Sequence, residues 1–335
     1  MNRFLFIYFL LFNACIIQAQ DIHFSQFYAS PLTLNPAATG DFKGDWRINN
    51  IYRNQWSALG PGYMTNALGF DMPVYLAGEK FSGGINLVTD KSGPGGLFVT
   101  KINLSVAWHR TFNKHALHFG YQAGYVMKSV NVNNLTFPDQ FNQETGNFDT
   151  KLLSYDDKLN NHYSFLDMNV GIGWNRKFGK ITPKAGFALF HINKPKDSFY
   201  KQDDNLKIRS VFTFQLKWEL NEIIYIQPDI LYMQQQKAID FVAGVRAGRK
   251  MKENAANITG IFAGLHARNT FTAETDAAII TAGVNLKNID VGLSYDINVS
   301  SLQPATKNKG AFEISFIYTV LSTRLVKIKI PCDRY

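Results

Sequence analysis

Cysteine is scarce in this chain, and long apolar runs are absent once the first twenty residues are passed. Only two of the 335 residues are cysteine, so a disulfide-rich scaffold is excluded. No later stretch approaches the roughly 18 consecutive apolar residues that a transmembrane helix needs. Only helices and closed barrels satisfy every backbone polar group in lipid. If this chain spans a membrane, it must therefore do so with strands.

Known catalytic and metal-binding motifs are missing as well. The sequence contains no G-x-S-x-G, H-E-x-x-H, C-x-x-C or phosphate-cradling glycine motif. Its seven histidines include no two at a ligand spacing on one face of a strand, since His115 and His118 would point to opposite faces. We therefore expect no enzyme, no metal site and no cofactor. Chance convergence of Ser, His and an acid at a barrel rim is the alternative that sequence leaves open.

The basic residues are not gathered into runs. The formal net charge is +9, but Lys and Arg are scattered among Asp, Asn and Gly. Proteins that bind nucleic acid concentrate their basic residues on one face, so we expect no nucleic-acid partner. Surface loops, a polar barrel interior and attraction to the headgroups of outer-membrane lipid account for the charge.

The first residues are typical of a secretory signal peptide. Arg3 supplies the positive charge, an apolar core follows, and Ala19 stands where cleavage is expected. We assign residues 1–19 to the signal peptide. Cleavage after Ala19 removes Cys15 and leaves Cys332 as the one remaining cysteine. We therefore expect no internal disulfide in the exported chain. The residues before Cys15 resemble a lipoprotein-processing site only loosely, and lipidation is left open.

Residues 20–44 are rich in turns and precede the first predicted strand. Asn35 is expected to cap a short helical turn that has Pro36 at its first position and ends near Gly40. Phe24, Phe27 and Tyr28 stand at positions i, i+3 and i+4, so they would share one face of a preceding helical turn. We predict that this segment is a plug inside a barrel. Its candidate contact residues are Phe24, Phe27, Tyr28, Asn35 and Pro36.

The rest of the chain alternates apolar and polar residues with a period of two. In residues 117–128, Leu117, Phe119 and Tyr121 share one face, while the residues between them are polar or glycine. Counting such segments predicts an all-β fold with fourteen strands. They are residues 46–57, 63–75, 81–90, 98–112, 115–129, 162–177, 181–192, 208–219, 223–235, 239–250, 257–267, 276–287, 289–298 and 311–320.

Two features favour a barrel in a membrane over a soluble sandwich. The polar face carries mostly Gly, Asn, Ser and Asp, and aromatic residues gather near strand ends, as in outer-membrane barrels. Short connections alternate with longer ones such as 130–161 and 193–207. We therefore predict a 14-stranded antiparallel transmembrane β-barrel over residues 45–320, with both mature termini in the periplasm. Residues 321–335 would be a periplasmic tail.

Several charged residues fall on the inward face of the predicted strands. Buried guanidinium groups need acidic partners, so a network that holds the plug is one interpretation. The other is that these charges line water. The candidates are Arg47, Arg53, Asp167, Asp296 and Glu313.

Strings at both ends of the chain occur together in one known family. They are DIHFSQFYASPLTLNPAATG (21–40), YRNQW (52–56), GLSYDINVSSL (292–302), GAFEISFIY (310–318) and PCDRY (331–335). In this order they resemble the PorP/SprF family of outer-membrane proteins, which are associated with the type IX secretion system. The resemblance covers both ends and, by strand pattern, the whole chain.

The resemblance implies a role without catalysis. The family's function would be to help export, retain or anchor a partner surface protein, such as a gliding adhesin or another cargo with a C-terminal sorting domain. It also implies docking to periplasmic lipoproteins or a peptidoglycan-binding protein of the machine. By this analogy Cys332, Arg334 and Tyr335 are docking candidates, and connections 130–161 and 193–207 would hold the cargo.

A second family gives a different hypothesis. Long-chain fatty-acid channels are similar in outline, with fourteen strands and an N-terminal hatch that contains a string like Asn35-Pro36-Ala37. On that reading the chain would transport hydrophobic small molecules. An apolar pocket beside the plug would favour transport, and a polar interior would favour the secretion role.

Overall fold

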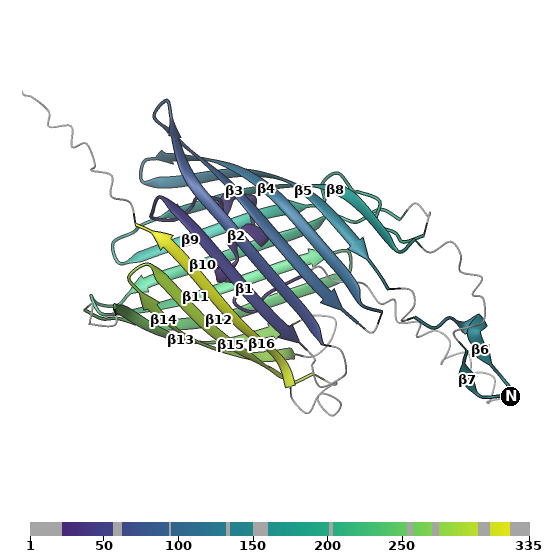
Figure 1. Cartoon of the computed structure of the whole chain (residues 1–335). Coiled ribbons are helices and arrows are strands. Elements are labelled where there is room, and N and C mark those ends of the chain that lie inside the picture. Colours follow the sequence, from purple (N-terminus) through teal and green to yellow (C-terminus); the bar gives the residue numbers. More distant parts are fainter. Residues whose placement is uncertain are drawn as a thin grey trace, which may run out of the picture.

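The barrel is formed by fourteen strands in one closed antiparallel sheet (Figure 1). The computed structural model describes residues 22–55, 62–93, 95–131, 135–149, 160–200, 204–252, 257–269, 275–300 and 309–321. The predicted signal peptide, Trp56 and the tail residues Cys332, Arg334 and Tyr335 lie outside these ranges. None of the described helices is long and apolar enough to cross a membrane.

Each barrel strand pairs with its neighbours in sequence, and the first pairs with the last. The strands are β1 (Trp46–Gln55), β2 (Tyr63–Leu76), β3 (Glu79–Ser92), β4 (Leu97–Phe112), β5 (His115–Ser129), β8 (His162–Arg176), β9 (Ile181–Phe190), β10 (Arg209–Glu219), β11 (Ile224–Gln235), β12 (Ala238–Lys250), β13 (Ile258–Asn269), β14 (Thr275–Leu286), β15 (Ile289–Asn298) and β16 (Lys309–Val320). Pairing of β1 with β16, from Trp46↔Val320 to Gln55↔Ala311, closes the barrel. A separate hairpin of β6 (Phe141–Asn142) and β7 (Asn147–Phe148) stands apart from the barrel in Figure 1.

The alternation seen in the sequence separates the outer from the inner face. On β4, Leu104 and Val106 are 61% and 60% exposed, whereas Ser105 between them is 2% exposed. The exposed positions are apolar, and they form the surface that lipid would cover. The predicted fold class is therefore confirmed, and the observed strand limits differ from the predicted ones by a few residues at most.

The two ends of the barrel differ in their connections. At one end the strands are joined by short turns, including residues 77–78, 113–114 and 287–288. At the other end the connections include residues 130–161 and 191–208. We call these the short-turn end and the long-connection end.

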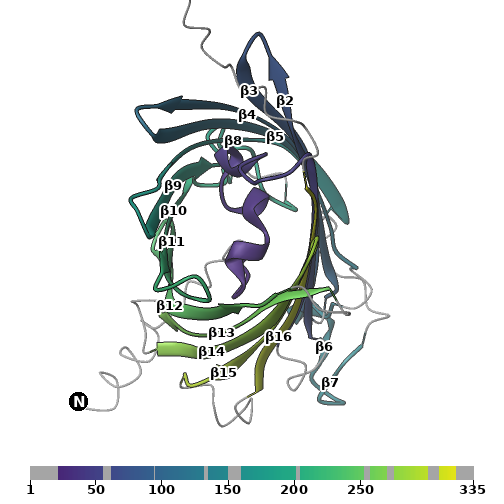
Figure 2. The ribbon, with the colours of Figure 1, turned by 90° about the vertical axis from the view of Figure 1, so that its left-hand side faces the viewer.

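The N-terminal segment, residues 22–45, lies inside the barrel (Figure 2). It contains three short 3-10 helices, η1 (Phe27–Ala29), η2 (Pro31–Thr33) and η3 (Pro36–Ala38). Its first residue, Ile22, shares a cavity with Arg209 at the long-connection end of β10. Its last residue, Asp45, donates its backbone N–H to the carbonyl of Val320 at the short-turn end. The segment therefore runs along the barrel from one end towards the other.

Apolar residues also point into the barrel, where they pack on the N-terminal segment. Phe24 is buried with Ile51, Ala67 and Val88. Phe27 is buried in a different cluster, whose other members are Leu34, Ala188, Phe190, Val211, Leu231, Met233, Val242 and Ile279. The expectation of a polar inner face was thus incomplete, because the segment needs apolar partners of its own. Phe24 and Phe27 do not share one aromatic face.

Candidate functional site: the barrel interior

Charged residues of β1, β13, β15 and β16 hold the start of the N-terminal segment. Arg53 donates to Glu313 at 2.5 Å and to Asp296 at 3.1 Å. Arg268 donates to Asp296 at 3.0 Å, and Ser25 of the segment donates its hydroxyl to the same carboxylate at 2.8 Å. All five side chains are buried. We call Ser25, Arg53, Arg268, Asp296 and Glu313 the ion-pair cluster.

Glu313 binds the segment through its backbone. Its two carboxylate oxygens accept the N–H groups of Ser25 and Gln26 at 2.7 and 2.8 Å. These N–H groups lie immediately before η1, and hydrogen bonds to an ionised carboxylate are stronger than those between neutral groups. Glu313 therefore holds the backbone of the segment and balances Arg53 at the same time.

A second ion pair holds the other end of the segment. Arg47 donates two hydrogen bonds to Asp71, at 2.9 and 2.7 Å, and the Asp71 carboxylate also accepts the Gly40 N–H at 2.6 Å. Gly40 has a φ of +68°, a conformation that favours glycine. Lys80 donates to the Gly40 carbonyl at 2.8 Å. Both backbone groups of this turn are thus bound to the barrel wall.

The middle of the segment rests on glycines of β5, β8 and β9. The Asn35 side chain accepts the Ala37 N–H at 2.8 Å, as the predicted cap requires, and Pro36 begins η3. The same side chain donates to the carbonyl of Ile172 at 2.9 Å. A Cβ atom at Gly120 would overlap the backbone of Pro36 and Ala37. Glycine at this position therefore permits the close approach of segment and wall.

Asp41 and a histidine pair form a further contact near the short-turn end. Lys184 binds Asp41 at 2.5 Å, and His118 lies 3.8 Å from its carboxylate. Burial raises the pKa of Asp41, but the charges of Lys184 and the two histidines, together with the hydrogen bond from Lys184, outweigh it and hold that pKa well below its ordinary value. His118 contacts His109 of the adjacent strand, with 2.6 Å between their Nδ1 atoms. The spacing of histidines along single strands could not reveal this pair, because it joins two adjacent strands.

Tyr28 contacts a third set of charges. The Arg246 guanidinium lies 3.4 Å from the centroid of the Tyr28 ring and donates to Asp229, which also hydrogen-bonds His266 at 2.7 Å. Burial raises the pKa of Tyr28 to about 12, so its hydroxyl stays protonated at neutral pH. Phe27 packs edge-on against both Tyr28 and His266.

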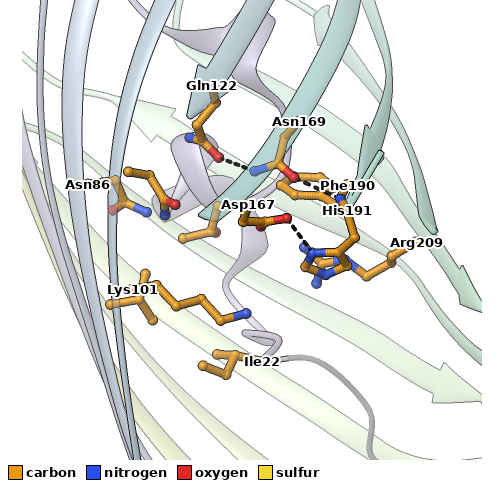
Figure 3. Close-up of a pocket in the computed structure, with 12 residues that line it drawn as sticks. Ile22, Asn86, Lys101, Gln122, Asp167, Asn169, Phe190, His191 and Arg209 are labelled. Carbon is orange, nitrogen blue, oxygen red and sulfur yellow. Dashed lines mark hydrogen bonds and ion pairs between the residues drawn. The ribbon is translucent and has the colours of Figure 1, made fainter. Parts of the chain in front are cut away.

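Asp167 lies beside a small cavity of about 30 Å³ towards the long-connection end (Figure 3). Its carboxylate binds His191 Nδ1 at 2.8 Å, and Asn169 accepts the His191 N–H at 3.0 Å. Gln122 in turn accepts a hydrogen bond from Asn169 at 3.0 Å. The residues that line the cavity are Ile22, Thr33, Asn86, Val88, Lys101, Asn103, Gln122, Asp167, Asn169, Phe190, His191 and Arg209.

A row of asparagines crosses the wall at this level. Asn49, Asn86 and Asn103 are joined through the cross-strand pairs Asn49↔Gly69, Gly69↔Asn86 and Asn86↔Asn103. We call these three residues the amide row. Asn49 and Asn86 are both fully buried, and neither amide has a hydrogen-bond partner among the described residues. Each such unpaired group costs about 1–3 kcal/mol, so the pair is an exception among buried polar groups.

The predicted site residues thus fall into four groups. Arg47, Arg53, Asp296 and Glu313 contact the N-terminal segment through the ion pairs above, whereas Asp167 pairs with His191 beside the cavity. The five candidates on the segment contact the wall in three places: Phe24 in one apolar cluster, Phe27 and Tyr28 near His266 and Arg246, and Asn35 and Pro36 at Gly171. Cys332, Arg334 and Tyr335 lie outside the described residues. Within the described ranges, no three His, Cys, Asp or Glu residues are grouped to hold a metal ion.

Comparison with known proteins decides the family. The model of the type IX secretion system membrane protein PorP/SprF matches residues 16–318. The chain belongs to the PorP/SprF family. As a family member with a closed antiparallel barrel, it is an outer-membrane β-barrel of the type IX secretion system. No curated protein matches this PorP/SprF chain in sequence.

Solved structures share the barrel architecture at low identity. A monoaromatic hydrocarbon channel, CymD, is 11% identical, with a TM-score of 0.51 over 88% of this chain and 94% of its own. The Ralstonia pickettii toluene transporter TbuX is also 11% identical, with a TM-score of 0.48 over 87% and 94%. At this identity the likeness shows the fold alone.

Proposed function

We propose that this PorP/SprF protein helps to export, retain or anchor one partner surface protein at the outer membrane. The family match across residues 16–318 is the observation that carries the proposal. The partner would be a secreted adhesin or another cargo with a C-terminal sorting domain. The barrel would act without catalysis and without a cofactor.

The two ends of the barrel are proposed to serve different partners. Outer-membrane barrels have short periplasmic turns and longer outside loops, so the short-turn end would face the periplasm. There, residues 321–335 would dock to a lipoprotein or a peptidoglycan-binding protein of the secretion machine. Connections 130–161 and 193–207 would hold the cargo outside. The N-terminal segment would act as a plug that keeps the interior closed to free diffusion.

The contacts of the N-terminal segment support this role over the transport of hydrophobic molecules. A transporter of apolar solutes would need a roomy apolar pocket beside the segment. The cavity found there is small, and its lining mixes polar residues such as Asn86 and Asp167 with the apolar side chains of Ile22, Val88 and Phe190. Elsewhere the segment is bound to the wall by buried ion pairs and hydrogen bonds.

Deletion of the gene tests the proposal. The expected result is the loss of one surface protein from intact cells, while other proteins of the same secretion system still reach the surface. Surface labelling followed by mass spectrometry measures both. If every surface protein stays in place and growth on a lipid or hydrocarbon substrate fails, the transporter hypothesis replaces this one.

A further inference from the structure

We infer that the buried carboxylate of Asp240 binds the α-ammonium group at the N-terminus of the mature chain. Removal of the signal peptide then creates the partner of this carboxylate and completes the attachment of the N-terminal segment to the barrel. The inference concerns the processed chain itself and does not depend on the proposed function.

Asp240 is a buried acid without a hydrogen-bond partner. It lies on β12 and is 6% exposed, and neither of its carboxylate oxygens has a hydrogen-bond partner among the described residues. The other acids buried inside the barrel include Asp71, Asp229 and Asp296, each of which pairs with an arginine. A carboxylate taken out of water is stabilised by a positive charge or by several donors, so Asp240 lacks what the other acids have.

The basic groups near Asp240 do not compensate its charge. His23 of the N-terminal segment is the one basic residue within 4.0 Å among the described residues, with its Nδ1 3.6 Å from the carboxylate. Burial lowers the pKa of His23, so its ring is neutral at pH 7. Arg268 is held by two other carboxylates, and the Arg209 guanidinium lies over the ring of Phe190.

A cavity of about 20 Å³ adjoins the Asp240 carboxylate near the long-connection end. On this measure one water-sized group needs about 10–15 Å³, so the cavity holds a single small group and excludes larger ligands. An ammonium group is close to water in size, carries a positive charge and donates three hydrogen bonds. The residues that line the cavity are His23, Arg209, Met233, Gln234, Gln235, Ala238 and Asp240.

The start of the mature chain is within reach of this cavity. Cleavage after Ala19 makes Gln20 the first residue, three positions before His23. Three extended residues span about 11 Å at most, and the His23 ring already lies beside the carboxylate. In the uncleaved precursor the same nitrogen belongs to a neutral peptide group. Cleavage therefore supplies the missing cation, and the mature N-terminus would lie inside the barrel instead of in the periplasm, as predicted from the sequence.

A metal ion fits the cavity less well. Calcium takes six to eight oxygen ligands, and magnesium requires an octahedral shell. Apart from the Asp240 carboxylate, the lining side chains offer the amide oxygens of Gln234 and Gln235, and the Gln234 oxygen already accepts a hydrogen bond from Tyr232. The described residues thus supply too few oxygen ligands for either ion.

Carbamylation of the purified mature chain in detergent tests the inference. Cyanate is small and reacts only with the uncharged form of an amine, so the pH dependence of the rate gives the pKa of the α-amino group. Mass spectrometry of the N-terminal peptide identifies the first residue and measures the product. We expect this pKa to lie at least one unit above its ordinary value of about 8, which lowers the rate at pH 7 about tenfold. An ordinary pKa, or a first residue cyclised to pyroglutamate and thus without an ammonium group, would overturn the inference.

Two Asp→Asn variants separate this ion pair from a general loosening of the N-terminal segment. Asp240→Asn removes the charge beside the N-terminus, whereas Asp71→Asn removes a charge that binds the Gly40 N–H at the other end of the segment. We expect Asp240→Asn to return the pKa of the α-amino group to about 8 and Asp71→Asn to leave it raised. Equal pH profiles in the two variants would show that Asp240 is not the partner. If Asp240→Asn does not assemble, the wild-type profile decides.

Discussion

The two sides of the barrel interior treat their polar groups in opposite ways. On the wall formed by β1, β15 and β16, the buried charges of Arg53, Asp296 and Glu313 pair with one another and with the N-terminal segment. On the wall formed by β1 to β3, the amides of Asn49 and Asn86 are buried and have no hydrogen-bond partner among the described residues. The first wall holds part of the chain itself. The second carries buried amides that the described residues leave unpaired.

The largest effect is expected where the paired wall is broken. Glu313→Ala leaves Arg53 buried without its partner and frees the N–H groups of Ser25 and Gln26. Loss of one member of a buried ion pair costs about 3–5 kcal/mol. Urea unfolding of the purified barrel in detergent measures this loss. The double variant Arg53→Met, Glu313→Leu should recover part of the stability, because Arg53 is no longer buried without its partner while the N–H groups of Ser25 and Gln26 still lack their acceptor. A loss below about 1 kcal/mol for Glu313→Ala would contradict the assignment.

A steric change should displace the segment without altering charge. Gly120→Val places side-chain atoms where the backbone of Pro36 and Ala37 lies, and such overpacking costs about 1–3 kcal/mol. We expect the segment to become sensitive to added protease in detergent. Gly83→Val is the matched control, because no atom lies within 4 Å of a Cβ built at Gly83. Equal protease resistance in the two variants would show that Gly120 does not seat the segment.

Acid should weaken the contact at Asp41. The pKa of this carboxyl is depressed in the folded chain, so the contact stabilises the fold above the ordinary pKa of 3.8 and is lost as pH falls below it. Lys184 is 41% exposed, which limits the contribution to about 1 kcal/mol. Asp41→Asn should lose this amount already at pH 7 and show a flatter stability curve between pH 5 and about 2. A curve parallel to that of the wild type would rule the contact out.

The smallest effect is expected at the unpaired wall. Asn86→Leu removes two polar atoms that have no partner among the described residues, so the barrel should lose no stability and gain up to about 1 kcal/mol. The same unfolding measurement applies. A loss of more than about 1 kcal/mol would mean that Asn86 is satisfied within the protein, and the contrast between the two walls would disappear.

The sequence predicted features that depend on neighbouring residues. Alternation along a strand identified the lipid face, and Asn35 before Pro36 identified a capped turn. Contacts between residues far apart in the sequence could not be predicted in this way. Ser25 and Glu313 are 288 positions apart, and the contact of His109 with His118 depends on the pairing register of β4 and β5. The inward charges could be named from strand parity, but their individual partners could not.

The amide row was missed for the same reason. Asn49, Asn86 and Asn103 are unremarkable within their own strands, and they form a row only when four strands are aligned in register. Burial without a partner is also a property of three-dimensional packing, because any of these side chains could have met a donor or acceptor across the lumen. The apolar partners of Phe24 and Phe27 required the same information.

The bond between Glu313 and the backbone of Ser25 joins the beginning of the chain to its final strand. The leading segment cannot acquire this anchor before the final strand is in place. A chain truncated before β16 would lack both the seam and the acceptor for the N–H groups of Ser25 and Gln26. It would have to hold its segment by the remaining contacts, such as those with β2, β8 and β9.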